Sequence, residues 1–372
     1  MNLKKSLLHF ALLILIGTSC QQNNQPTPSP TNNNNNNGGN TTTQSWVPAT
    51  PFASPNGIVY CMTVYNNELY IGGTFNQVGG VVANGGIAKW NGTSWAAVPG
   101  PGTPVRHMVV FNGNLFVSSN HVLNSNNAYP LKKWNGLSWT NTGIYGVSAT
   151  CINNGQLIVT GGGGIKDSLG NILGSVATYA TNNSWSFLPA GAGGHSICVY
   201  NNEIYTGGGP IKKWSGSAWI DVTGVTSNNN NTIQCLDVLN NKLIAAGSIG
   251  SIGGITAHDV MQYDGTQWSN VGFSNGISTP PQSPGFVNST LLDGNDLYFG
   301  TYQGYWTGAA WQRVVKWNGS QWSGLAGNSN LQPSGFPYFI YSIIKYNGTL
   351  FIGGDFSGGT TTTYFINLCK LQ

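Results

Sequence analysis

One stretch recurs along this chain: an aromatic residue, a tight turn and a second aromatic residue, first seen in Lys89-Trp90-Asn91-Gly92-Thr93-Ser94-Trp95. Asn-Gly between two apolar runs predicts a β-hairpin with a two-residue type I′ turn, because that turn needs positive φ at both central residues. Copies start at Lys133, Lys213 and Lys316, a variant with Tyr for the first Trp starts at Gln262, and a looser copy starts at Tyr179. The chain is therefore expected to be an array of similar β units.

A second element recurs seven times: a short strand that begins with Leu or Ile and often ends on glycines, as in Leu69-Tyr70-Ile71-Gly72-Gly73. An apolar strand such as Val59–Tyr65 precedes it, and the aromatic hairpin follows. Seven successive units of four short strands predict an all-β fold. The specific prediction is a seven-bladed β-propeller with four-stranded blades. An open β-solenoid is the alternative. The seven copies begin at Leu69, Leu115, Leu157, Ile204, Leu243, Leu297 and Leu350.

The last unit lacks its outer strand, because the chain ends at Gln372, where the hairpin turn should begin. A matching strand occurs at the other end of the chain, in Gln44–Pro48, and contains Trp46. We predict that Trp46 pairs with the strand Phe365–Leu371 and closes the ring, which leaves no unpaired sheet edge.

The composition fits many strands and tight turns, since only 6% of the residues are charged and 53 of 372 are Gly. The formal net charge is +4, and the basic residues are scattered rather than clustered. This distribution argues against nucleic acid as a partner. We expect a monomer.

Residues 1–20 predict an export signal: Lys4 and Lys5, the apolar run Leu7–Ile16, then Gly17-Thr18-Ser19-Cys20. The segment resembles a bacterial lipoprotein leader, although Gly17 stands where that motif has a Leu-like residue. The resemblance implies lipidation of Cys20 and an outer-membrane or cell-surface location. Ordinary cleavage near Ser19, giving a periplasmic or secreted protein, is the alternative.

Residues 21–43 are rich in Asn, Pro and Thr and predict a disordered tether, which leaves 44–372 for the propeller. No other stretch approaches the ~18 apolar residues of a membrane span. Attachment to a membrane is therefore expected through the lipid anchor alone.

Glycine-ended strands followed by aromatic strands and Trp residues resemble kelch-type propellers of the galactose-oxidase-like group. The resemblance covers 44–372 and rests on Gly72-Gly73, Gly207-Gly208 and Gly353-Gly354 together with the paired Trp residues. The tight aromatic hairpin departs from the kelch pattern. Because such propellers include both binding modules and copper oxidases, the resemblance implies the architecture and leaves the ligand open.

The connections are predicted to divide between two faces because strand direction alternates. The short turns within the two hairpins of each unit share one face, called here the short-loop face. The longer connections, such as Thr74–Gly85, Gly163–Gly174 and Ser269–Gly285, share the other, the long-loop face. Loops on a rigid scaffold commonly carry binding residues, so a ligand is expected on the long-loop face.

The candidate ligand-binding residues are the aromatic and basic side chains that do not repeat. Tyr302 to Arg313 is expected to be an aromatic loop that suits a saccharide or a protein hot spot, or that only packs on the ring. Arg106, His107 and His195 open inner strands. His107, His121 and His195 could bind a metal, although polar histidines satisfied by hydrogen bonds are the preferred reading. The candidates are Tyr302, Tyr305, Trp306, Trp311, Arg313, Arg106, His107 and His195.

The remaining chemistry is sparse. The paired Trp residues are interpreted as packing between units, because they repeat at a structural position. Glu68 and Glu203 are expected to be solvated turn residues, and no two carboxylates form a glycosidase pair. Buried free thiols are favoured for Cys61, Cys151, Cys198, Cys235 and Cys369, with a Cys151–Cys198 disulfide as the alternative.

These observations predict an exported, lipid-anchored, non-catalytic propeller without a cofactor that binds a glycan or a protein. One alternative is a propeller enzyme, a metal-dependent oxidase or a sugar-active lyase or hydrolase, that uses His107, His195 and Asp237. Another is a structural surface or adhesion component.

Overall fold

The computed structural model describes residues 45–49, 54–102, 104–119, 129–223, 231–257, 259–271, 286–306, 311–325, 339–359 and 364–372. All regular structure in these ranges is β-strand. Within them there is no helix with the length and hydropathy needed to cross a membrane. The predicted leader, the tether, Cys20 and His121 lie outside the described residues.

Most strands form antiparallel units of four, in chain order except where β1 joins the last unit. Two further pairs, β4 (Gln77–Val78) with β5 (Val81–Val82) and β22 (Ser251–Ile252) with β23 (Ile255–Thr256), form separate two-stranded sheets. The first unit is β2 (Val59–Tyr65), β3 (Glu68–Gly73), β6 (Ile87–Trp90) and β7 (Trp95–Ala97). The second unit is β8 (His107–Phe111), β9 (Asn114–Ser118), β10 (Pro130–Trp134) and β11 (Trp139–Tyr145). The third unit is β12 (Ala149–Asn153), β13 (Gln156–Lys166), β14 (Ile172–Tyr179) and β15 (Trp185–Leu188). The Tyr145–Lys166 pair joins these two into one eight-stranded sheet.

The second half of the chain repeats the arrangement. It contains β16 (Ser196–Tyr200), β17 (Glu203–Gly207), β18 (Ile211–Trp214), β19 (Trp219–Asp221), then β20 (Thr232–Leu239), β21 (Lys242–Ser248), β24 (Val260–Tyr263), β25 (Trp268–Asn270). The next unit is β26 (Val287–Asp293), β27 (Asp296–Trp306), β28 (Trp311–Trp317) and β29 (Trp322–Gly324). The last sheet contains β30 (Phe339–Tyr346), β31 (Thr349–Gly359), β32 (Tyr364–Leu371) and, on its outer edge, β1 (Trp46–Pro48).

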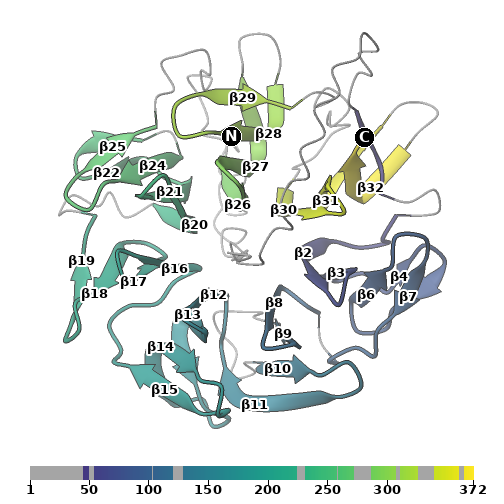
Figure 1. Cartoon of the computed structure of the whole chain (residues 1–372), viewed down its shortest axis with the longest axis horizontal. Helices are drawn as coiled ribbons and strands as arrows, with labels where there is room; N and C mark the ends of the chain where they lie inside the picture. The colour runs from purple at the N-terminus through teal and green to yellow at the C-terminus, as the bar shows by residue number, and fades with distance from the viewer. Residues whose placement is uncertain are drawn as a thin grey trace, which may run out of the picture.

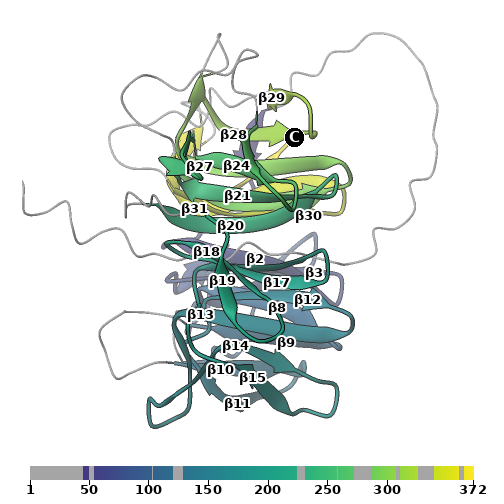
Figure 2. The same ribbon diagram turned by 90° about the vertical axis from the view of Figure 1, so that its left-hand side faces the viewer.

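The sheets surround a common centre, with the first strand of each unit innermost (Figure 1). Seen from the side, the strands run along the central axis, so their ends form the two faces of the molecule (Figure 2). This is a β-propeller-like arrangement rather than the open row of a solenoid. All seven predicted second strands are present, in β3, β9, β13, β17, β21, β27 and β31.

The glycines that end the second strands are explained by close approach of the next unit. A β-carbon on Gly72 would be 2.7 Å from Val105 Cγ1, and one on Gly207 would be 2.6 Å from Ile233 Cγ2. Real β-carbon contacts are not that short, so only a very small residue fits. Ser118, Thr160 and Ala246 take the equivalent place in three other units.

The two ends of the described chain are joined by backbone pairing. Trp46 lies opposite Leu371, and Pro48 lies opposite Cys369. Side chains also join the last unit to the first: the Tyr346 hydroxyl donates to the Asn67 carbonyl at 3.1 Å.

The aromatic hairpin differs from its prediction in turn type. Trp90 pairs with Trp95, so the loop runs from Asn91 to Ser94 rather than over two residues. Gly92 has φ of 102°, but Asn91 is not among the positive-φ residues of the described chain. Asn91 Oδ1 instead accepts from the Thr93 and Ser94 amides at 2.8 Å each. The side chain therefore closes the turn as an Asx motif, so the type I′ assignment is wrong here.

Positive φ at both central residues occurs in the hairpin between the first two strands of six units; in the β26–β27 turn only Gly294 has positive φ. Asn66 and Asn67 have φ of 51° and 60°, and Asn201 and Asn202 have 49° and 62°. Consecutive Asn residues tolerate this left-handed conformation better than other residues with side chains. The type I′ geometry thus belongs to the turns between the first and second strands.

The paired aromatic rings pack between units, as predicted. The Trp90 and Trp95 ring centroids are 5.3 Å apart. The second Trp of later hairpins donates its indole N–H to a carbonyl of the preceding unit, as Trp219 does to Pro189 at 2.8 Å and Trp322 to Val271 at 2.7 Å. These rings therefore belong to the contacts between neighbouring units.

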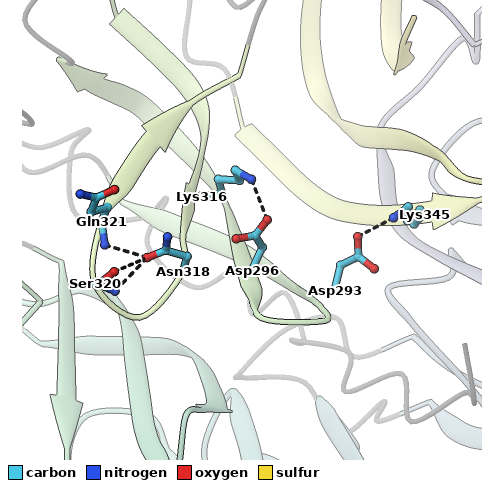
Figure 3. Close-up of polar contacts among 7 residues, drawn as sticks. All are labelled: Asp293, Asp296, Lys316, Asn318, Ser320, Gln321 and Lys345. Atoms are coloured by element: carbon cyan, nitrogen blue, oxygen red, sulfur yellow. Dashed lines mark hydrogen bonds and ion pairs between the residues drawn. The ribbon is translucent and has the colours of Figure 1, made fainter. Parts of the chain in front are cut away.

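The short-loop face carries ion pairs that the sequence reading missed. Glu68 and Glu203, predicted to be solvated, pair with Lys89 at 2.7 Å and Lys213 at 3.0 Å. The lysine precedes the first Trp of the hairpin, and its strand brings it beside the turn carboxylate. Figure 3 shows the equivalent Lys316–Asp296 pair, the Lys345–Asp293 pair and the Asn318 turn.

Two expected loops are instead strands. Tyr302–Trp306 extends β27 and Trp311–Arg313 begins β28, with Trp306 opposite Trp311. Gly163–Lys166 belongs to β13, which pairs irregularly with β14 around its glycines. In both cases the ladder hydrogen bonds continue past a local irregularity, which a composition-based loop prediction does not anticipate.

The cysteine prediction is correct at four positions. Cys61, Cys151, Cys198 and Cys369 are buried free thiols, so Cys151 and Cys198 form no disulfide. Cys235 is buried as well, within β20.

Candidate aromatic site on the long-loop face

The inner strands begin on the long-loop face, because their far ends carry the short turns. At this end of the inner strands and their neighbours lies a run of contacting rings. We call it the aromatic row; its members are Tyr60, Tyr341, Phe339, Tyr302 and Phe286.

Arg106 lies at one end of the aromatic row, just before β8. Its Cζ is 4.0 Å from the Tyr60 ring centroid, and its Nη2 donates to the Tyr60 hydroxyl at 3.1 Å. Both a cation–π contact and a hydrogen bond therefore hold the guanidinium over the ring. Burial, as the largest effect, raises the pKa of Tyr60 and outweighs the opposing effect of Arg106.

The row continues from the first unit into the last two. The Tyr60 and Tyr341 centroids are 5.3 Å apart. Phe339 stacks on Tyr341 at 5.3 Å with an interplanar angle of 5°, and on Tyr302 at 4.5 Å with 19°. Tyr302 also meets Phe286 edge-to-face at 5.8 Å.

The row is covered unequally. Tyr60 and Tyr341 are 4% and 2% exposed, whereas Phe286, Tyr302, Phe339 and Arg106 are partly exposed. The inner rings therefore anchor the row, and the outer rings and Arg106 each keep part of their surface exposed.

Asp355 is the acidic group of this site. It pairs in register with Phe339 and is partly exposed. Burial raises its pKa, and its charge also contributes to raising the pKa of Tyr60 and of Tyr341. The site thus holds Arg106 as a cation and Asp355 as an anion. Among the ion pairs of the described residues there is none between these two.

Arg313 supports the far end of the row. Its Nη1 donates to the Tyr302 carbonyl, and its own carbonyl accepts from Thr301 Oγ1 at 3.0 Å. For Tyr305, Trp306 and Trp311 only the backbone is described, so their predicted ligand contacts stay predictions. Of the predicted residues, the structure brings Arg106, Tyr302 and Arg313 to one site.

His107, His195 and Asp237 lie away from the aromatic row, each at a different contact between neighbouring units. His107 is 2% exposed, and its Nε2 is 2.8 Å from Thr150 Oγ1. Burial lowers its pKa to about 3, so it is neutral at ordinary pH. Asp237 accepts from the Thr290 hydroxyl, and burial raises its pKa to about 7.

His195 packs beside Gly162, where a β-carbon would be 3.2 Å from its Cε1. Burial lowers its pKa as well. Within the described part of the chain no three His, Cys, Asp or Glu side chains gather as a metal site would require. The sequence-based grouping of His107, His195 and Asp237 is not reproduced by these positions.

Most of the aromatic row escaped the sequence reading. Tyr60, Phe339 and Tyr341 lie in apolar inner strands and resemble core residues there. Phe286 and Asp355 are separated from Tyr60 by more than half of the chain. The available signal was that several inner strands begin with an aromatic ring where other units have small residues.

No protein-family model matches the sequence, and neither does any curated protein. Among solved structures, the extracellular domain of BT4673, described as a one-component system from B. thetaiotaomicron, superposes with a TM-score of 0.53 at 14% identity over 88% of this chain. This chain spans 40% of that one. YCF48 bound to D1 peptide superposes with a TM-score of 0.50 at 10% identity, over 87% of this chain and 97% of that one. Similarity at this level shows a shared β-propeller-like fold.

Proposed function

We propose that this protein is an exported, non-catalytic binding scaffold, a seven-bladed β-propeller that holds a glycan or protein ligand at the aromatic row and Arg106. The observation that carries the proposal is the partly exposed row with the partly exposed Arg106 at its end. Aromatic and Arg side chains supply most of the energy at binding hot spots. The extracellular-domain neighbour agrees with export.

Several contacts support a closed ring of seven blades. β1 pairs with β32 to complete the sheet of β30 and β31. Contacts of the last sheet with the first, through Gly353 and Val59 and through Tyr346 and Asn67, repeat those between consecutive units. A closed ring fixes the positions of the inner strands, so the row is presented as a rigid surface.

Export and anchoring complete the proposal. Residues 1–20 direct export, Cys20 carries lipid, and residues 21–43 hold the propeller away from the membrane. Fractionation of cells expressing the full chain tests this: the wild-type protein is expected in the membrane fraction and Cys20→Ser in the soluble fraction. Equal membrane association of both would contradict lipid anchoring.

Ligand binding is tested with two probes, an array of oligosaccharides and a displayed library of random peptides. The wild-type protein is expected to retain members of one class, and Arg106→Gln combined with Phe286→Ser is expected to lose them. Ile220→Ser is the matched control, because Ile220 is a 44% exposed apolar side chain on the outer strand β19. Retention of neither class, or equal retention by the double variant, would reject a ligand at the row.

A further inference from the structure

Resting on the proposed function, we infer that the ligand of the aromatic row is a peptide segment with an apolar side chain next to a carboxylate, and not a saccharide. Three features of the site lead to this choice: the way its rings face each other, the state of Arg106 and the place of Asp355.

Phe339, in the middle of the row, offers its edge rather than its faces. Phe339 lies between Tyr341 and Tyr302, stacked on both with interplanar angles of 5° and 19°. Its two faces are therefore occupied by other rings. Saccharide C–H groups carry partial positive charge and pack against the negative ring face, whereas ring edges are positive. The edge of the partly exposed Phe339 therefore favours apolar side chains and carboxylate or carbonyl oxygens.

Arg106 supplies charge complementarity for a carboxylate. No described carboxylate lies within ion-pair distance of it. One of its five N–H donors is used by the Tyr60 hydroxyl, and Nε is buried without a partner among the described residues. A guanidinium with free donors binds a carboxylate in a bidentate manner, and this pairing is stronger than a bond to a neutral hydroxyl.

Asp355 makes the two ligand classes distinguishable. Its carboxylate is opposite Phe339 on the neighbouring strand and close enough to affect the charge state of Tyr60 and Tyr341. For an acidic peptide it is a repulsive neighbour that limits affinity. For a saccharide it is a good acceptor for hydroxyl groups, so its removal has the opposite effect on binding.

The experiment selects binders from a displayed library of random peptides on the purified full chain, with Arg106→Gln as the counter-selection. Enriched peptides are then synthesised, and their affinity is measured by fluorescence anisotropy. We expect an apolar residue next to Asp or Glu in these peptides. Arg106→Gln is expected to weaken binding about tenfold or more, and Asp355→Asn to tighten it about threefold. Lys213→Gln, which removes a charge on the short-loop face, is expected to change nothing.

An oligosaccharide array run in parallel decides against the inference if it finds the ligand. Retention of saccharides that Asp355→Asn weakens would overturn the peptide assignment while leaving the proposed scaffold function intact. Enriched peptides without acidic residues, or tighter binding in Arg106→Gln, would also overturn it. Failure of wild-type protein to retain either probe rejects the inference and the proposed function together.

Discussion

Val59 of β2 lies against Gly353 of β31, so closely that a β-carbon on Gly353 would be 2.6 Å from Val59 Cγ1. The same contact joins Gly300 to Ile340 at 2.6 Å in the preceding pair of units. Residues nearly three hundred positions apart thus repeat the contact made between neighbouring units. The last unit therefore contacts the first in the way that the β26–β29 unit contacts the last.

Gly353→Ala is therefore expected to lower the free energy of unfolding by about 1–3 kcal/mol, because the added methyl group overpacks the seam. Urea unfolding followed by Trp fluorescence measures the change. Gly209→Ala is the matched control, since a β-carbon at Gly209 would meet nothing within 4 Å. Equal loss of stability in both variants would show that the seam is not the cause.

Trp46 is expected to contribute more to the free energy of unfolding than any other residue in the N-terminal strand. It is 1% exposed and packs with Ile352, Leu291 and Cys369 in one apolar cluster. Trp46→Ala should cost about 3–5 kcal/mol, as for other buried Trp truncations, and Trp46→Phe clearly less. Deletion of residues 44–49 should lower the Tm sharply. An unchanged melting curve would disprove the proposed closure.

The repeated parts of the fold could be predicted from the sequence, because each is set by local pattern. Strand starts such as Leu69 and Leu350 follow from apolar periodicity, and the position of Trp46 follows from counting hairpins. The turn at Asn91 could not be assigned by the same means, since its side chain competes with the backbone for the amides of Thr93 and Ser94.

Of the candidate site, the sequence predicted the face and only part of the residues that the structure brings together there. Arg106 and Tyr302 stood out because no other unit has such residues at those places. Tyr60 and Phe339 could not be recognised, because an aromatic residue in an apolar strand gives the same sequence pattern whether its ring packs in the core or lies at the long-loop face. Their contact depends on how two distant units meet, which no local pattern encodes.

Stability is expected to rise as the pH falls from about 8 to about 6.5. Burial raises the pKa of Asp259 to about 8, against ~3.9 in the unfolded chain. A raised carboxyl pKa contributes stability that is present below the unfolded pKa and is lost as the pH rises through the folded one. The slope is about 1.4 kcal/mol per pH unit per group. Asp237, with a pKa of about 7, adds to it.

Asp259→Asn is the variant for this alkaline limb, because the amide oxygen can still accept from the Ile249 amide as Oδ1 does at 3.1 Å. The Tm of this variant should depend less on pH between about 6.5 and 8. Asp259→Gly should also relieve backbone strain, since Asp259 has φ of 66° and Gly86, at the equivalent place in the first unit, has 68°. If both variants kept the wild-type dependence of Tm on pH in this range, the loss of stability at alkaline pH would belong to another group.

Below about pH 6.5 the protonation of the buried histidines lowers the stability, whereas the protonation of the buried aspartates raises it. Burial lowers the pKa of His107 to about 3, so it contributes stability that is present above ~6.5 and is lost as the pH falls toward 3. The lowered pKa of His195 acts in the same direction. Between about pH 6.5 and 4 the wild-type Tm is therefore expected to stay nearly level. In His107→Gln, whose amide can keep a hydrogen bond to Thr150, the Tm should instead continue to rise toward acid. Thermal melts across this range test the assignment, and a pH profile of Tm that is the same in His107→Gln and wild type would show that His107 is not the group being protonated.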